Sequence, residues 1–209
     1  MKAVIFDLDG VICSTDKYHF DAWKKLADSL DIYFDEKINN RLRGVSRMKS
    51  LEIILEKSSI IYSQKQKEDL ANIKNDYYRE LLEKMTPSDL DVEVKKTLDA
   101  LKDKGLKLAI GSSSKNAKLI LRQIGLDNYF DAVSDGTNII NTKPDPEVFL
   151  KAASMLNEKA EDCVVVEDAI VGIEAAHAGG FVSAGINDAK NSKYVNYKLE
   201  SFSDLLSIL

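Results

Sequence analysis

The sequence predicts an α/β protein: a parallel sheet with helices on both faces, interrupted early by an all-helical segment. Short apolar runs at 4–6, 106–111, 163–166 and 182–186 alternate with amphipathic stretches over most of the chain. Such alternation is typical of strands joined by crossover helices. From about 16 to 85 the alternation stops, and this stretch has helical patterns without a convincing strand.

The helices that join the strands are expected to end at glycines. Gly105, Gly125 and Gly179 each follow an amphipathic segment, and glycine is the commonest residue just past a helix end. Because strands joined through helices run parallel, both faces of the sheet should be covered. The predicted helices span 94–104, 117–124, 147–156 and 170–178.

Two helical patterns stand out in the interrupting segment. One lies around 20–30, where apolar residues recur every three or four positions. The other spans 65–84. The expected apolar faces consist of Phe20, Trp23, Ala27 and Leu30 in the first helix, and Leu70, Ile73, Tyr77 and Leu81 in the second.

Pro87 marks a linker over 85–89 that returns the chain to the sheet. The predicted organisation is therefore a Rossmann-like core domain, 1–14 and 87–209, with a helical domain inserted over 15–86. An insert of this length suits a small domain.

Composition restricts the class of protein. The chain has 209 residues, of which 44% are hydrophobic, enough for one sizeable core with or without a small second domain. Charged residues are 30% with a net charge of −5 and no basic patch, so nucleic acid is not an expected partner. The apolar run before Asp7 is too short for a signal peptide, and no stretch is long enough to span a bilayer.

The two cysteines, Cys13 and Cys163, suggest neither a disulfide framework nor a zinc site. We expect them to be buried residues associated with strands rather than reactive thiols. A cytoplasmic protein without a membrane partner is therefore expected.

The first strand ends in two acids, within the sequence VIFDLDGV. Asp7 and Asp9 are two residues apart and start from the same face of a strand. Open α/β sheets bind ligands at the carboxyl ends of their strands. Two unpaired acids there would repel each other, and a divalent cation would remove that cost. The alternative is a pair of solvated loop carboxylates.

A second acid pair, Glu167 and Asp168, follows the strand at 163–166. Together with Asp7 these residues supply the hard oxygen ligands that suit Mg²⁺. The alternative for this pair is a helix N-terminus that favours negative charge.

Two further strand ends carry candidate phosphate-binding groups. The sequence SSSKN, 112–116, follows the strand at 106–111 and combines three hydroxyls with backbone amides at a helix start. An ordinary serine N-cap is the alternative. Lys143, in the sequence TKPDP, would balance the charges of a phosphate and of the carboxylates; the alternative is a solvated lysine.

In this order, the four motifs resemble those of the haloacid dehalogenase superfamily of phosphotransferases: DLDGV, SSSKN, Lys143 and VVEDA. The inserted helical segment is similar to the small cap domain of that superfamily, so the resemblance covers the whole chain. Within the superfamily, the segments at 7–23, 42–55, 74–76, 112–116 and 142–144 resemble the β-phosphoglucomutase family most. The cap segment, with RGVSR after 42, and His19 make this resemblance specific.

The resemblance implies roles for the residues of the core. Asp7 would be the nucleophile that becomes an aspartyl phosphate, Asp9 the general acid and base, and Thr15 a hinge residue. Mg²⁺ would be held by Asp7, the backbone of Asp9, Glu167 and Asp168. The implied phosphate-binding residues are Ser112, Ser113, Ser114, Lys115, Asn116 and Lys143.

The resemblance also implies that the cap holds the sugar and its distal phosphate. Other interpretations remain open: His19 as a surface histidine, Trp23 as core with one edge at the site, and Arg43 and Arg47 as a solvated face. Two positions depart from the family, which usually has Lys at 43 and commonly Ala at 113. The implied cap residues are His19, Trp23, Arg43, Gly44, Val45, Ser46, Arg47, Ser50, Lys74 and Asn75.

The implied activity is a Mg²⁺-dependent interconversion of β-D-glucose 1-phosphate and glucose 6-phosphate by a monomer. It would pass through an aspartyl phosphate and glucose 1,6-bisphosphate. Two alternatives stay open: a phosphatase that uses water as the acceptor, and a binding protein that keeps the fold. Arg47, Ser50 and Lys74 favour the mutase, because they suit a second phosphate on the substrate.

Overall fold

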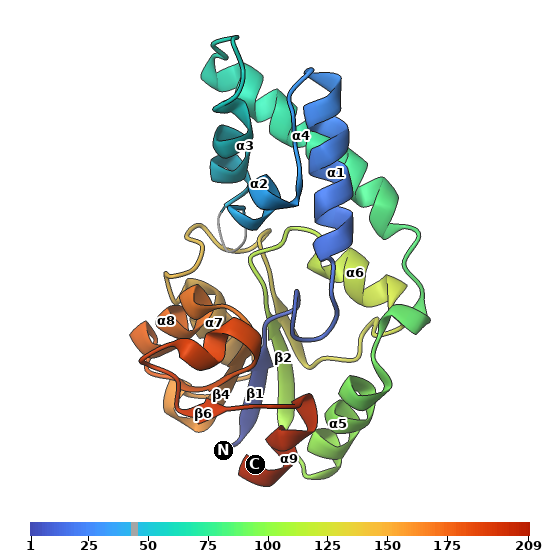
Figure 1. The fold of residues 1–209 in the computed structure, drawn as a ribbon. Coiled ribbons are helices and arrows are strands. Elements are labelled where there is room, and N and C mark those ends of the chain that lie inside the picture. Colours follow the sequence, from blue (N-terminus) through green and yellow to red (C-terminus); the bar gives the residue numbers. More distant parts are fainter. Residues whose placement is uncertain (43–45) are drawn as a thin grey trace. The chain divides into compact units, whose positions relative to one another are not determined.

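Six parallel strands form the sheet in a computed structural model that describes residues 1–42 and 46–209 (Figure 1). Their order is β3-β2-β1-β4-β5-β6, so the chain builds one side of β1 first and then the other. The boundary between β1 and β4 is therefore the switch point where such sheets bind ligands. The strands are β1 (Ala3–Phe6), β2 (Lys107–Gly111), β3 (Ala132–Ser134), β4 (Cys163–Glu167), β5 (Val182–Gly185) and β6 (Tyr197–Lys198).

The register brings the ends of the central strands to one edge of the sheet. Phe6 of β1 lies opposite Ile110 of β2 and Val166 of β4. Asp7 directly follows β1, and Glu167 is the last residue of the neighbouring strand β4. This edge therefore collects the residues that follow β1, β2 and β4.

Helices cover both faces of the sheet, which confirms the predicted α/β core. On one face, Ile5 and Val165 share a buried cluster with residues of α7 and α8. On the other face, the Phe6 ring stacks on Phe202 with 5.7 Å between centroids, near α5 and α9 (Figure 1). The helices are α5 (Val92–Asp103), α6 (Ala117–Gln123), α7 (Glu147–Met155), α8 (Ile170–Ala178) and α9 (Leu205–Ile208).

The helix expected around 20–30 begins earlier, at Asp16, whereas the other predicted helices and strands begin and end within about two residues of their observed bounds. Two strands were not predicted. β3 and β6 are only three and two residues long, too short for a periodic pattern to register. α5 begins two residues earlier than predicted because the side chain of Asp91 accepts a hydrogen bond from the Glu93 backbone and caps the helix. The chain also contains short 3₁₀ helices: η1 (Pro87–Asp89), η2 (Ala160–Asp162), η3 (Asn187–Asn191) and η4 (Phe202–Asp204).

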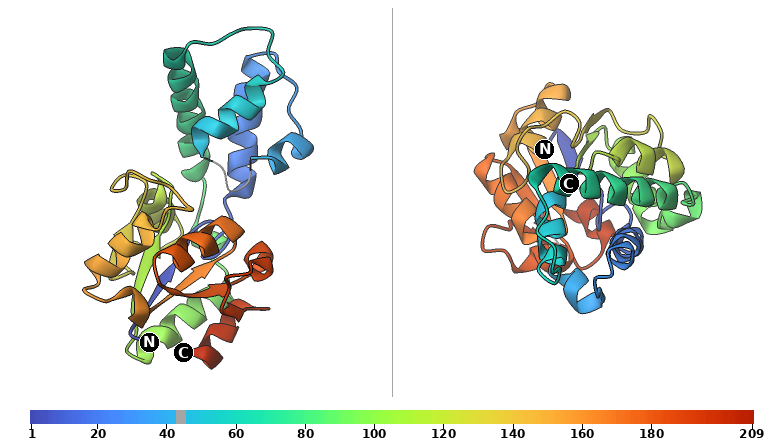
Figure 2. Two further views of the ribbon diagram at one scale, coloured as in Figure 1. Left: turned by 90° about the vertical axis from the view of Figure 1, so that its left-hand side faces the viewer. Right: turned by 90° about the horizontal axis from the view of Figure 1, so that it is seen from above.

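The chain divides into two units: Met1–Ser14 together with Met85–Leu209, and Thr15–Lys84. Among its described residues, the second unit contains helices and connecting loops but no strand. α1 and α3 both pack against α4, as the further views in Figure 2 also show. Trp23 and Ala27 of α1 belong to its buried cluster. Its helices are α1 (Asp16–Ser29), α2 (Glu36–Asn40), α3 (Arg47–Leu55) and α4 (Gln64–Leu82).

The buried face of α4 differs from the prediction by one position. Ala71, Lys74, Tyr78 and Leu82 are buried, whereas Ile73 is 41% exposed. The prediction was wrong because it used apolar residues alone and so left Lys74 out of the buried face. Its side chain is instead buried between aromatic rings, which rotates the buried face toward it.

Along residues 1–42 and 46–209, the structure has no helix with the length and apolar character that crossing a membrane requires.

Candidate active site

Three carboxylates converge at the switch point of the sheet. The backbone N–H of Asp7 donates to the carbonyl of Val166 at 2.9 Å, which holds Asp7 beside β4. Asp7, Glu167 and Asp168 each place a carboxylate oxygen within 4.8 Å of the others. Asp7 and Glu167 are 7% and 1% exposed, so they are not solvated loop acids.

Lys143 lies between two of these carboxylates. Its Nζ is 2.5 Å from Asp7 Oδ1 and 2.5 Å from Glu167 Oε1. The same ammonium lies 4.7 Å from the ring centre of Phe149 on α7. With a side chain only 9% exposed, Lys143 is not an ordinary solvated lysine.

The cluster holds more negative charge than one lysine can balance. Burial lowers the pKa of Lys143, but the charges of Asp7 and Glu167 outweigh this and raise it. Burial raises the pKa of Glu167 to about 7; Lys143 opposes the rise and Asp7 adds to it. Burial and the neighbouring Glu167 and Asp7 raise the pKa of Asp168 to about 8. A site with this excess of negative charge favours a cation.

Two glycines leave room for the carboxylates. A Cβ on Gly10 would lie 2.1 Å from Asp168 Oδ2, and the φ of Gly10 is +83°, which disfavours any other residue. A Cβ on Gly172 of α8 would lie 2.0 Å from Glu167 Oε1. Each glycine therefore lets a backbone segment lie directly against an acid of the cluster.

Asp9 lies in the turn that follows Asp7. It pairs with Cys13 in an isolated bridge, and the Gly10 backbone donates to the Cys13 carbonyl at 2.8 Å. Burial, Asp9 and Asp7 raise the pKa of the Cys13 thiol. Cys13 is thus a buried, protonated thiol.

The serine loop follows β2, next to the end of β1. Ser112 Oγ accepts from the Ser114 backbone at 3.1 Å, and Ser114 Oγ accepts from the Asn116 backbone at 3.2 Å. The N-cap of α6 is Asn116, so the alternative of a serine N-cap is wrong. The Ser113 hydroxyl is buried, with no hydrogen-bond partner among the residues that the structure describes. Lys115 is exposed.

The helical unit holds a second group of predicted residues. Lys74 is 2% exposed, and its Nζ lies 4.7 Å from the ring centre of Trp23 and 4.5 Å from that of Tyr78. The same nitrogen is 2.8 Å from His19 Nδ1, and His19 stacks on Tyr78 with 4.1 Å between centroids. His19 is therefore not a plain surface histidine, and Trp23 is core.

The contact with Lys74 assigns the His19 tautomer. A protonated lysine can only donate, so His19 Nδ1 accepts and the ring proton lies on Nε2. Burial, together with the charges of Lys74 and Arg47, holds the pKa of His19 well below its usual value. His19 is a neutral donor through Nε2.

The other predicted residues of this unit lie on or near its helices. Thr15 is buried and precedes α1; Ser46 caps α3 by accepting from the Lys49 backbone at 3.3 Å. Arg47 and Ser50 lie on α3, and Asn75 lies on α4. Arg43, Gly44 and Val45 lie outside the described residues.

Comparison with known proteins gives the family. The family model described as haloacid dehalogenase-like hydrolase matches residues 1–180. The chain belongs to the haloacid dehalogenase-like hydrolase family.

Several relatives in this family share most of the chain. The β-phosphoglucomutase of Bacillus subtilis is 42% identical over 98% of this chain and 92% of its own length. A crystal structure of β-phosphoglucomutase from Clostridium difficile is 38% identical, covers 98% of this chain and 93% of the solved chain, and gives a TM-score of 0.87. A phosphorylated carbohydrates phosphatase of Thermotoga maritima is 34% identical over 91% of this chain and 89% of its own length.

Sequence reasoning missed three residues that contact predicted site residues within their own unit. Gly10 belongs to the DLDGV motif, but its close approach to Asp168 depends on tertiary structure. Gly172 lay inside a predicted helix, where a glycine is itself a signal of close packing. Tyr78 follows Lys74 by four residues and so shares its helical face.

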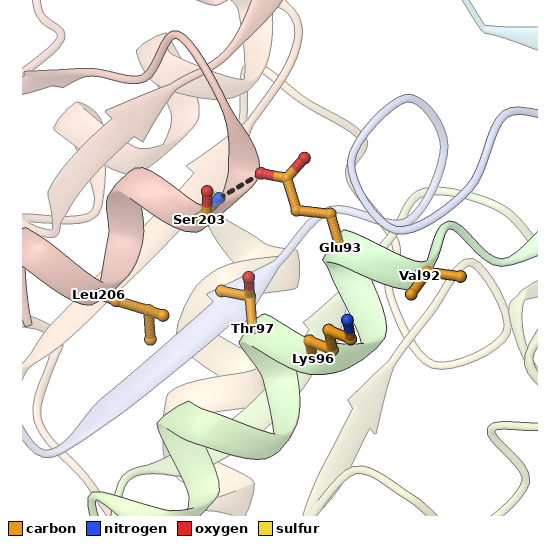
Figure 3. A pocket seen from close by; sticks show the side chains of 6 residues that line it. All are labelled: Val92, Glu93, Lys96, Thr97, Ser203 and Leu206. Carbon is orange, nitrogen blue, oxygen red and sulfur yellow. Dashed lines mark hydrogen bonds between the residues drawn. The ribbon is translucent and has the colours of Figure 1, made fainter.

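A hollow of about 410 Å³ lies elsewhere in the core unit, between α5 and the C-terminal segment (Figure 3). There Glu93 accepts from the Ser203 backbone at 2.9 Å. None of the predicted site residues lines this hollow, so it is not part of the candidate active site. Its lining residues are Val92, Glu93, Lys96, Thr97, Ser203 and Leu206.

Proposed function

We propose that the chain is an isomerase that interconverts β-D-glucose 1-phosphate and glucose 6-phosphate. The observation that carries the proposal is the buried cluster of Asp7, Lys143, Glu167 and Asp168 at the switch point. The similarity to the β-phosphoglucomutase of Bacillus subtilis supports the choice of reaction.

The residues present fit a Mg²⁺ ion. Three carboxylate oxygens lie within 4.8 Å of one another, and oxygen-only ligands suit Mg²⁺. Asp7, Glu167 and Asp168, with the backbone carbonyl of Asp9, would hold the ion. Bound there, Mg²⁺ would offset the negative charge of a phosphoryl group.

Asp7 is the proposed nucleophile. Its carboxylate would attack the phosphorus and form an aspartyl phosphate, which divides the transfer into two steps. Lys143 already contacts Asp7 Oδ1 at 2.5 Å, so its ammonium is suited to offset the repulsion between the carboxylate and the incoming phosphate.

Asp9 is the proposed general acid and base. It would protonate the sugar oxygen that leaves and later take the proton from the sugar hydroxyl that attacks. This division of work gives the two acids of the DLDG motif different roles.

The serine loop and Lys143 are proposed to bind the transferring phosphate. The Ser112 and Ser114 hydroxyls accept from backbone amides, which orients their O–H groups. Ser113 would contribute through its backbone, since its hydroxyl is buried. The proposed set is Ser112, Ser113, Ser114, Lys115, Asn116 and Lys143.

Residues 15–86 are proposed to act as a cap domain on the core formed by 1–14 and 87–209, with Thr15 at the hinge. Arg47 would pair with the distal phosphate of glucose 1,6-bisphosphate, the proposed intermediate and activator. His19 would donate from Nε2 to the sugar phosphate, with Lys74 holding its tautomer. The remaining proposed cap residues are Trp23, Arg43, Gly44, Val45, Ser46, Ser50 and Asn75.

A sugar-phosphate phosphatase is the second candidate function. It would use Asp7, Asp9 and Mg²⁺ in the same way but accept the phosphoryl group on water. The relative from Thermotoga maritima that is named a phosphorylated carbohydrates phosphatase favours this candidate.

One assay separates the two functions. The protein is given β-D-glucose 1-phosphate, Mg²⁺ and a trace of glucose 1,6-bisphosphate, while glucose 6-phosphate and free phosphate are followed together. Rapid glucose 6-phosphate with little free phosphate supports the mutase. Free phosphate without isomerisation identifies a phosphatase.

Two variants test the division of roles. Asp7→Asn is expected to abolish both products, because no nucleophile remains. Asp9→Ala is expected to lose nearly all turnover but still to accept phosphate slowly from a good phosphoryl donor. Equal and mild losses from both changes would contradict the assigned roles.

A further inference from the structure

The loop that leads into Lys143 has little side-chain packing. Ile140 is 91% exposed, and Asn141 and Thr142 are also exposed. Among residues 139–142, Ile139 is the one that packs against the core cluster. We therefore expect hydrogen bonds, more than side-chain packing, to hold the backbone of this loop in place.

Glu147, in the first turn of α7, supplies two of those hydrogen bonds. Its Oε1 accepts from the Ile140 backbone at 3.0 Å, and its Oε2 accepts from the Asn141 backbone at 2.7 Å. These hydrogen bonds lower the pKa of Glu147, so the carboxylate stays charged. Hydrogen bonds to a charged acceptor are among the stronger ones in proteins.

The same helix secures the loop at other points. Lys151 donates to the Asn138 carbonyl, and Asp145 Oδ1 accepts from the Glu147 backbone at 2.9 Å. Phe149 presents its ring to the Lys143 ammonium. α7 therefore holds both the loop before Lys143 and one side of the lysine itself.

We propose that Glu147 is a positioning residue for phosphoryl transfer. Its carboxylate fixes the backbone of Ile140 and Asn141 and thereby holds the Lys143 ammonium between Asp7 and Glu167. The expected effect of Glu147 on turnover rests on the proposed function. Its effect on the geometry of the loop does not.

The first test is the rate of the mutase reaction in two Glu147 variants. Glu147→Ala removes both acceptors and is expected to lower kcat/KM about 10- to 100-fold, the usual cost of losing a residue that orients a catalytic group. Glu147→Gln keeps one acceptor and is expected to fall between wild type and Glu147→Ala. Glu174→Ala, which changes an exposed glutamate of α8, is the matched control and should keep wild-type rates.

The second test does not depend on mutase activity. Binding of inorganic phosphate with Mg²⁺ is measured by calorimetry for wild type, Glu147→Ala, Lys143→Ala and the double variant. If Glu147 acts through Lys143, Glu147→Ala weakens phosphate binding in wild type but adds no further loss in the Lys143→Ala background. Equal losses in both backgrounds would overturn the proposal.

The third test observes the hydrogen bonds directly. In a pH titration followed by NMR, the amide protons of Ile140 and Asn141 should shift together at the pKa of Glu147, below that of an ordinary glutamate. The shift should disappear in Glu147→Gln, while the fold is checked by thermal unfolding. Amide protons that do not respond would show that the carboxylate does not hold the loop. A protein that passes the second and third tests but makes no glucose 6-phosphate would refute the proposed mutase and leave the positioning role intact.

Discussion

At the scale of single residues, the acid cluster depends on the room left by glycines as well as on the charges of its side chains. Glu167 is buried, pairs with Lys143, and accepts from the backbone amides of Asp168 and Ala169 at 3.1 and 3.2 Å. That conformation exists because Gly172 has no side chain. Gly172 thus allows the Glu167 carboxylate to occupy this position, although glycine has no side chain of its own.

Gly172→Ala is therefore expected to weaken Mg²⁺ binding more than it weakens the fold. The new methyl would meet the end of the Glu167 side chain, which would have to turn away from its position beside Asp7, while alanine favours the helix. We expect the Mg²⁺ concentration for half-maximal activity to rise about 10- to 100-fold. The melting temperature serves as the control: a large fall with unchanged Mg²⁺ dependence would contradict this account.

His19 gives a second prediction at the residue scale. Burial and two nearby cations disfavour its protonated form, so the ring should stay neutral at pH 6 with its proton on Nε2. Nitrogen-15 NMR of the imidazole reports both the charge and the tautomer. In Lys74→Met the pKa should rise and the Nδ1–H tautomer should become populated; an unchanged spectrum would contradict the assignment.

At the scale of elements, local patterns predicted most helices and strands because their periodicity is a property of neighbouring residues. They failed where the element was short, as for β3 and β6, or where a polar residue was buried, as for Lys74. The acids, the serine loop and Lys143 could be found because each stands at the end of a strand or in a distinctive turn. Their mutual contacts could not, since Lys143 and Asp7 are 136 positions apart.

The start of α4 provides a test at this scale. Ser63 Oγ accepts from the Gln66 backbone at 3.3 Å, and Gln66 Oε1 accepts from the Ser63 backbone at 2.8 Å. Ser63→Ala should lower the free energy of unfolding by about 1 kcal/mol. Urea unfolding measures the change, and Ser63→Asp, which retains a capping oxygen, should remain near wild type. Equal losses in both variants would argue against the cap.

At the scale of the whole molecule, the acid cluster links stability to pH and Mg²⁺. The pKa values of Glu167 and Asp168, raised to about 7 and about 8, exceed those of the same groups in an unfolded chain, about 4. Between about pH 4 and about pH 8, the folded state therefore binds more protons than the unfolded state. The contribution of this cluster to stability therefore falls as pH rises from about 4 to about 8 and then levels off.

The prediction is tested on metal-free protein by unfolding at several pH values. Wild type should lose stability relative to Asp168→Asn as the pH rises through this window, because only wild type acquires the charge at 168. At pH 8, Mg²⁺ at 100 times its dissociation constant should restore about 2.7 kcal/mol to wild type. A stability difference between the two proteins that does not change with pH would refute the link.

The sequence by itself determined the class of the fold, the order of most of its elements and the motifs at the strand ends, because these follow from the spacing of residues along the chain. Only the tertiary structure decided that Lys143 bridges Asp7 and Glu167, that Gly10 and Gly172 lie against the acids, and that Lys74 is buried beside His19. These facts depend on which side chains meet after distant segments pack together. Packing sets burial, and burial sets the pKa values and the tautomer on which the proposed chemistry depends.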